Sequence, residues 1–236
     1  MGSLRETNLA YEDGEHSIHG TWLSIDVVAL TRDLDAARVA LITRDGQPHR
    51  GETTLPGGLL AAWHQETVEQ AARRIVREKA GVEVVGGVTV LDVVSDPGRD
   101  ERGHTVSIVV GARIPAGATG AVPVDQIPAD MPFGHSAMVH TALAKISTGL
   151  FTDPALTYAL LGEATTMTEV MALARACDPK ASESTIGSRL RRCGMYEADP
   201  DRNRKRETGA GRPALVFTKT RSANTGGHAA AARVRA

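Results

Sequence analysis

A glycine-rich turn that runs directly into an amphipathic helix constrains this sequence more than any other stretch. Residues 55–82 read LPGGLLAAWHQETVEQAARRIVREKAGV. Thr67, with Gln70 three residues later, is typical of a capping box at a helix start. The apolar residues that follow at helical spacing predict a helix packed on a sheet. They are Val68, Ala71, Ala72 and Ile75.

The end of this helix resembles a degraded Nudix box. Nudix proteins carry an R-E-U-x-E-E-x-G-U run, where U is a bulky aliphatic residue, on a helix that follows a glycine-rich loop. Residues 74–82 read RIVREKAGV, so the arginine, one glutamate and the glycine match. The loop 55–58 and Glu66 also fit the resemblance, although their separation is longer than the consensus. Ile75 and Lys79 stand in place of the first and third glutamates.

This replacement bears on catalysis. In the Nudix family the helix carboxylates hold the divalent metals that hydrolyse a nucleoside diphosphate linked to another group. Mg²⁺ needs several oxygen ligands, and two-metal hydrolysis needs carboxylates to anchor the ions. Ile75 offers no oxygen, Lys79 adds a positive charge, and Glu78 alone does not rebuild the site. We therefore expect a protein that binds a nucleotide but does not hydrolyse it well, with no catalytic residue, no metal and no required cofactor.

Composition limits the class of protein. The chain has 236 residues with 42% hydrophobic and 3% aromatic residues, which predicts an aliphatic core in one large or two ordinary domains. No apolar run is long enough to span a membrane and no signal peptide opens the chain, so we expect a soluble cytoplasmic protein. Cys177 and Cys193 fall at apolar helix positions and are expected to be buried free thiols.

The order of patterns predicts an α/β domain followed by a mainly helical one. Strands are expected at 23–30, 38–43 and 104–114, a strand with a Gly-Gly break at 82–94, and a closing helix at 136–146. Residues 115–132 look like a connection. The predicted organisation is a flexible arm at 1–20, an effector-sensing domain at 21–148, a winged helix-turn-helix domain at 149–221 and a disordered tail at 222–236.

The second domain has the pattern of a helix-turn-helix with a wing. A short helix is expected at 154–161, and Thr166 with Glu169 predicts a capping box for a second helix. A turn leads to Ser182, which is placed to cap a third helix that ends at Gly194. Strands at 195–198 and 214–218 would form the hairpin wing.

Charge on the third helix and the wing favours DNA binding. Ser184, Thr185, Ser188, Arg191 and Arg192 point away from the apolar stripe, and Arg189 flanks it. Such small hydroxyls at the start of a recognition helix contact base edges, and arginines suit phosphate or guanine. Residues 189–221 hold ten basic and four acidic residues, a local excess of +6 in a chain of net charge −1. A solvated helix face is the simpler alternative.

A degraded Nudix box followed by a winged helix is similar to the NrtR family of Nudix-related transcriptional regulators. The closing GRPA at 211–214 supports the likeness. The resemblance implies a Nudix-type α/β/α sandwich, a homodimer on a palindromic double-stranded operator, and repression of NAD synthesis or salvage genes under control of ADP-ribose or a related nucleotide. The implied effector residues are Arg44, Leu55, Pro56, Gly57, Gly58, Arg74, Glu78, Arg99 and Arg102. The implied DNA-binding residues are Ser182, Ser184, Thr185, Ser188, Arg189, Arg191, Arg192, Arg204, Lys205, Arg206 and Arg212.

Two other functions stay open at this point. One is a working Nudix hydrolase of ADP-ribose-like substrates with an accessory domain. The other is a nucleotide-responsive adaptor that binds protein instead of DNA. Arg99 and Arg102 would reach a phosphate in either case, although charged loops of this kind are more often simply solvated.

Overall fold

A computed structural model describes residues 11–12, 17–18, 21–31, 36–199 and 215–220. Its centre is a six-stranded mixed sheet with the order β10-β4-β3-β9-β8, and β7 pairs with β3 beside this path. The strands are β3 (Trp22–Thr31), β4 (Arg38–Ala40), β7 (Gly57–Leu59), β8 (Val88–Val94), β9 (Thr105–Ile114) and β10 (Ala121–Pro123). β3 and β9 run parallel in an unbroken ten-residue register, from Trp22 opposite Thr105 to Thr31 opposite Ile114.

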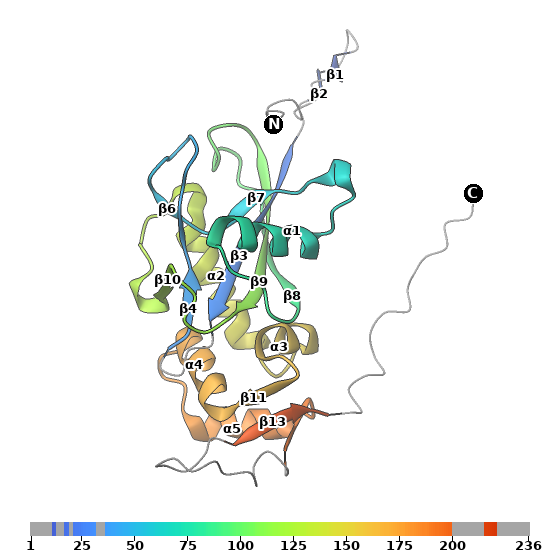
Figure 1. The fold of residues 1–236 in the computed structure, drawn as a ribbon, viewed down its shortest axis with the longest axis vertical. Helices are drawn as coiled ribbons and strands as arrows, with labels where there is room; N and C mark the ends of the chain where they lie inside the picture. Colours follow the sequence, from blue (N-terminus) through green and yellow to red (C-terminus); the bar gives the residue numbers. More distant parts are fainter. Residues whose placement is uncertain (1–10, 13–16, 19–20, 32–35, 200–214, 221–236) are drawn as a thin grey trace, which may run out of the picture.

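Alternation along β3 divides the core into two layers. Ile25, Val27 and Ala29 face one apolar cluster, which includes residues of helix α1 (Val68–Ile75). Val28 and Leu30 face the other, which includes residues of helix α2 (His135–Gly149). Figure 1 shows α1 and α2 on opposite faces of the sheet. This period-2 pattern therefore builds the predicted α/β/α sandwich.

Helix α1 begins as the sequence predicts. The Thr67 side chain accepts from the backbone N–H of Gln70, and the Gln70 side chain accepts from the N–H of Thr67. The helix continues as a π-helical turn, Val76–Ala80, and ends at Gly81 with φ 68°. Glycine suits this left-handed position because it has no Cβ.

The carboxyl-terminal part contains three helices and a small sheet. They are α3 (Pro154–Leu161), α4 (Met167–Cys177) and α5 (Glu183–Arg192), with strands β11 (Ala164–Thr166), β12 (Tyr196–Ala198) and β13 (Val216–Lys219). The capping box of Thr166 and Glu169 and the Ser182 cap are both present. β12 pairs antiparallel with β13, as expected for a wing, and β11 pairs with the other side of β13.

One apolar cluster joins the two parts of the chain. It runs from Val28 of the sheet through Met138 of α2 to Leu156 of α3, Ile186 of α5 and Phe217 of β13. The end of α2 is therefore not an exposed linker. The helices α3, α4 and α5 lie below the sheet in Figure 1. No helix in the described ranges combines the length and apolar character that a membrane span requires.

Several details differ from the sequence predictions. The strand expected at 38–43 divides into β4 and β5 (Ile42–Thr43), and β5 pairs with β6 in a separate sheet. The first half of 82–94 forms no strand, because this segment leaves α1 and only β8 joins the sheet. The connection at 115–132 contains β10, which pairs with β4. β11 was not predicted. Within the expected amino-terminal arm, β1 (Tyr11–Glu12) and β2 (Ser17–Ile18) form a short antiparallel pair.

Candidate functional site

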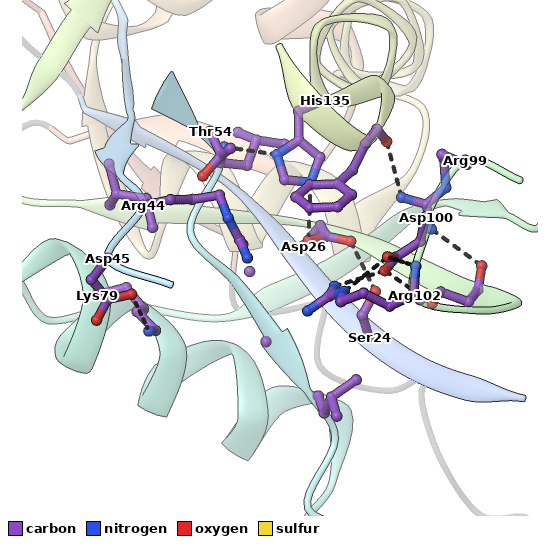
Figure 2. Close-up of a pocket in the computed structure, with 17 residues that line it drawn as sticks. Ser24, Asp26, Arg44, Asp45, Thr54, Lys79, Arg99, Asp100, Arg102 and His135 are labelled. Atoms are coloured by element: carbon purple, nitrogen blue, oxygen red, sulfur yellow. Dashed lines mark hydrogen bonds and ion pairs between the residues drawn. The ribbon is translucent and has the colours of Figure 1, made fainter. Parts of the chain in front are cut away.

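A cleft opens where the glycine-rich turn meets α1. An outer part of ≈ 1210 Å³ and an inner pocket of ≈ 100 Å³ share several lining residues. The volume is large enough for a nucleotide-sized ligand. Figure 2 shows the inner pocket, with side chains arriving from β3, the π-helical turn after α1, the segment before β6 (Thr53–Thr54), the loop before β9 and the start of α2. The shared residues are Arg44, Asp45, Gly57, Gly58, Leu59, Lys79 and Arg102.

Two guanidinium groups contact one aromatic ring in this cleft. The Cζ atoms of Arg44 and Arg102 lie 4.9 Å and 5.3 Å from the ring centroid of Phe133, and Arg102 also lies 5.3 Å from that of Trp22. Figure 2 shows the arginines pointing toward one another. Burial lowers the pKa of Arg44, and the nearby charge of Arg102 lowers it further. Because the two guanidinium groups repel each other and face the open cleft, they form a site suited to an anion.

A buried carboxylate and imidazole lie behind the glycine-rich turn. Nε2 of His135 is 3.4 Å from Oδ1 of Asp26, and both side chains are almost fully buried. The Leu55 N–H donates to Nδ1 of His135 at 3.0 Å. Because Nδ1 accepts this bond, the ring proton resides on Nε2 and faces Asp26. The first residue of α2 is thereby attached to both the sheet and the turn.

Hydrogen bonds extend from this pair to the loop before β9. Ser24 Oγ donates to Asp26 Oδ2 at 3.1 Å and lies 2.7 Å from Ser107 Oγ. Arg99 Nη2 donates to Ser107 Oγ at 2.6 Å, and its Nη1 donates to the Phe133 carbonyl at 3.0 Å. Arg99 thus holds the loop, the sheet and the 3₁₀ turn before α2 in one arrangement, and most of its donors bind the protein itself.

The pKa of Asp26 depends on these partners. Burial raises the pKa of its carboxyl, but the hydrogen bond from His135, together with those of Ser107 and Ser24, outweighs burial and leaves the pKa below its ordinary value. The carboxylate also explains the glycine opposite it. A Cβ at Gly57 would come within 2.2 Å of Asp26 Oδ1, so this position has no room for a side chain.

Arg102 is held by a neighbouring acid. Its Nε and Nη2 donate to the two carboxylate oxygens of Asp100 at 2.8 Å and 2.7 Å. Thr105 Oγ1 adds a bond to the same carboxylate at 3.2 Å. Burial raises the pKa of Asp100, but the bonds from Arg102 outweigh it and the pKa is lowered. The guanidinium therefore has a fixed orientation before any ligand arrives.

The Glu66–Arg74 pair connects the turn to α1. Arg74 Nε and Nη2 donate to Glu66 Oε1 and Oε2 at 2.7 Å and 2.8 Å, and Nη2 also reaches the Leu59 carbonyl at 3.1 Å. Glu78 Oε2 is farther from Arg74, at 3.5 Å. The longer spacing between the turn and Glu66 accommodates a 3₁₀ turn, Ala62–His64. Glu66 and Arg74, both part of the predicted motif, therefore fasten the turn to α1.

The two replaced glutamate positions have different surroundings. Ile75 is 1% exposed, and a Cβ at Gly58 would lie 3.2 Å from its Cγ1, so Ile75 belongs to the core. Lys79 lies in the cleft, with Nζ 3.6 Å from Asp45 Oδ1. In the part of the chain that the structure describes, no three His, Cys, Asp or Glu side chains are grouped to hold a metal ion. At the two replaced positions, Ile75 and Lys79 supply no carboxylate oxygen to a metal ion.

Most effector residues named from the sequence line this cleft. Those that do are Arg44, Leu55, Gly57, Gly58, Arg74, Glu78, Arg99 and Arg102. Pro56 is not among the lining residues, and its carbonyl accepts from the Val27 N–H at 2.9 Å. Sequence reasoning missed several lining residues, of which the charged or aromatic ones are Trp22, Asp26, Asp45, His64, Lys79, Asp100, Glu101, Phe133 and His135. An aspartate within the apolar run LSIDVVAL was a signal for a buried polar contact.

A NUDIX domain model matches residues 20–139, just over half of the chain. This chain belongs to the NUDIX family. An ADP-ribose pyrophosphatase from Methanocaldococcus jannaschii is 38% identical over 85 residues, which cover 34% of this chain and 48% of that protein. The chain thus spans about half the length of this curated relative.

Solved structures share the fold beyond the NUDIX domain. NrtR from Shewanella oneidensis, complexed with a 27mer DNA, has a TM-score of 0.64 and 22% identity over 84% of this chain and 93% of that chain. A MutT/nudix family protein from Enterococcus faecalis has a TM-score of 0.61 and 20% identity over 86% and 89%. The predicted likeness to NrtR, a NUDIX domain followed by carboxyl-terminal helices and a small sheet, is therefore confirmed for the fold.

Beyond the NUDIX domain, α5 presents part of the predicted DNA-binding face to solvent. The exposed residues are Ser182, Ser184, Thr185, Arg191 and Arg192, while Ser188 and Arg189 are half-buried. Arg189 turns toward the end of α2, where its Nη2 donates to the Leu150 carbonyl at 2.7 Å. Four predicted phosphate contacts, Arg204, Lys205, Arg206 and Arg212, lie outside the described residues.

Proposed function

We propose that this protein is a DNA-binding transcriptional repressor of NAD synthesis or salvage genes. Its NUDIX domain senses ADP-ribose or a related NAD-derived nucleotide, and ligand binding changes the affinity of a homodimer for a palindromic operator. The carboxyl-terminal domain at 149–221 reads the DNA. In this proposal the cleft binds the nucleotide without efficient hydrolysis.

The observation that carries the proposal is the path of α2. Its first residue, His135, is attached to Asp26 and to the turn that lines the cleft. Its last turn leads to Leu150, whose carbonyl accepts from Arg189 of α5. One 15-residue helix thus has one end in the ligand cleft and the other against the proposed reading helix. A ligand changes the DNA affinity only if it binds the two states of this connection unequally.

The cleft supports a nucleotide as the ligand. Arg44 and Arg102 supply positive charge for a diphosphate, and Phe133 and Trp22 supply aromatic surface. Trp22 Nε1 is buried, and it has no hydrogen-bond partner within the described ranges. The similarity to an archaeal ADP-ribose pyrophosphatase supports ADP-ribose as the first ligand to test.

The test is operator binding with and without ADP-ribose, repeated across a salt series. The proposal expects affinity that falls as salt rises, because neutralised phosphates release counterions, and a reproducible change on adding ADP-ribose. Arg191→Glu and Arg192→Glu should weaken DNA binding at unchanged ADP-ribose affinity. DNA binding that ignores ADP-ribose and NAD would remove the sensing half of the proposal.

A working hydrolase is the second candidate, favoured by the curated relative. It predicts AMP release from ADP-ribose with Mg²⁺ or Mn²⁺, and loss of that release in Glu78→Gln. An adaptor that binds protein is distinguished by charge reversal at Arg191 and Arg192, which should leave its partner bound.

A further inference from the structure

Arg44, Lys79 and Arg102 line both the inner pocket and the outer part of the cleft, and they differ in how firmly the protein holds them. Arg102 is fixed by two bonds to Asp100. Arg44 donates from Nε to the Pro48 carbonyl at 2.8 Å. Among the residues that the structure describes, the one charged partner of Lys79 is Asp45, at 3.6 Å. Lys79 is therefore the least constrained of these three charges.

The Lys79–Asp45 pair is readily exchanged. The Asp45 side chain is 86% exposed and that of Lys79 is 40% exposed, so water screens their attraction. Exposed pairs of this kind contribute little to stability. A phosphate entering the cleft can replace Asp45 as the partner of Lys79 at small cost.

Lys79 also has a suitable position. It lies in the π-helical turn that follows α1 and lines both the inner pocket and the outer cleft. In Figure 2 its side chain lies on the same side of the pocket as Arg44. Two acids that line the cleft have other partners: Asp100 binds Arg102, and Glu78 lies beside Arg74.

The same position is unsuited to a metal. The buried Ile75 supplies no oxygen, and an ammonium one helical turn later repels a divalent cation. An ammonium does provide a positive charge and three N–H donors, which suit phosphate oxygens. This part of the helix is therefore unsuited to a divalent cation but suited to an anion.

We propose that Lys79 binds the diphosphate of the nucleotide directly, so that the ligand binds without a divalent cation. This inference rests on the proposed function of the cleft as a nucleotide site. It adds Lys79 to the ligand-binding residues of the cleft and specifies that the nucleotide binds with no metal ion on its diphosphate.

Calorimetric titration tests this with ADP-ribose, and with ADP as a probe that has the diphosphate alone. Wild-type protein should give the same Kd in excess EDTA and in excess Mg²⁺. Lys79→Gln should weaken binding about ten- to a hundredfold in both buffers, which corresponds to the loss of one charged hydrogen bond. Lys79→Arg should retain most of the affinity. Lys145→Gln, which removes a lysine paired with Asp92 at 2.7 Å outside the cleft, should match wild type.

Three results would overturn the inference: wild-type binding that is lost in EDTA and restored by Mg²⁺, Lys79→Gln binding equal to wild type, or no binding of either probe. Thermal unfolding of each variant shows whether it is folded. Operator binding by the same preparations separates the two proposals, because DNA binding that persists without any diphosphate binding leaves the DNA-reading half intact.

Discussion

The guanidinium of Arg189 links the proposed reading helix, α5, to Leu150 at the end of α2. Its Nη2 donates to the Leu150 carbonyl at 2.7 Å, and its Cζ lies 5.6 Å from the ring centroid of Phe151. Leu150 and Phe151 are 2% and 5% exposed, so this contact lies at the edge of a packed core. Arg191 and Arg192, on the same helix, are exposed. Neighbouring arginines on α5 therefore have different surroundings.

Arg189→Gln should lower the free energy of unfolding by about 1–3 kcal/mol, because it removes a charged hydrogen bond and a cation–π contact. Arg191→Gln and Arg192→Gln should change stability by about 0.5 kcal/mol or less and should weaken DNA binding. Urea unfolding and DNA titration of the three variants provide the comparison. Equal stability of the three variants would show that the Arg189 contact does not contribute to the free energy of unfolding.

Gly57→Ala should destabilise the protein by about 1–3 kcal/mol and weaken ADP-ribose binding, because the new methyl group would meet the Asp26 carboxylate. Gly46→Ala is the matched control for the loss of stability, since nothing lies within 4 Å of its Cβ position. Thermal unfolding and calorimetry measure both effects. A Gly57→Ala protein as stable as the control would mean that the turn moves freely away from Asp26.

Acid should destabilise the protein partly through Asp26. Its pKa in the folded protein lies below the ordinary value of 3.8, so the unfolded chain takes up the proton first as the pH falls. The stabilisation that the ionised Asp26 carboxylate gives the folded protein is complete above pH 3.8. It is lost as the pH falls through the pKa that Asp26 has in the folded protein. Asp26→Asn should be less stable at neutral pH and should lose less stability on acidification. Urea midpoints across pH, with the exposed Asp96→Asn as control, test this; identical pH slopes in all three proteins would exclude the Asp26 contribution.

Cys177 should resist thiol reagents in the folded protein. Burial raises the pKa of its thiol to about 12, so almost no thiolate is present at pH 8. In a Cys193→Ala background, labelling at pH 8 should be slow in buffer and fast in urea. Rapid labelling in buffer would show that the α4–α5 region opens readily.

Local patterns in the sequence were sufficient for the order and type of most elements. The capping boxes at Thr67 and Thr166 depend on residues three positions apart, and α3 begins and ends where its apolar run does. The short strands β10 and β11 were missed because each depends on a distant partner, β4 and β13 respectively. A three-residue strand is too short to show the alternation of apolar and polar residues from which a strand is predicted.

The candidate site was only partly predictable. The glycine-rich turn and Arg74 belong to one local motif, and both line the cleft. Phe133 and His135 come to the same place only because the core positions the start of α2 behind β3. Helical geometry placed Arg189 beside the apolar stripe, and the family resemblance implied a role in DNA binding. Neither specifies that the end of α2 lies alongside it.

By itself, the sequence determined that a glycine-rich turn precedes a helix without the usual carboxylates, and that a basic helical unit follows, since both depend on residue types at short spacing. Only the tertiary structure decided that Asp26 meets His135 and that Arg189 meets Leu150. Those pairs are separated by more than thirty residues in the chain, and only packing of α2 against the sheet and the terminal helices brings them together. The physical reason is that side-chain periodicity fixes which face of an element is apolar, whereas the contacts of that face depend on the whole core.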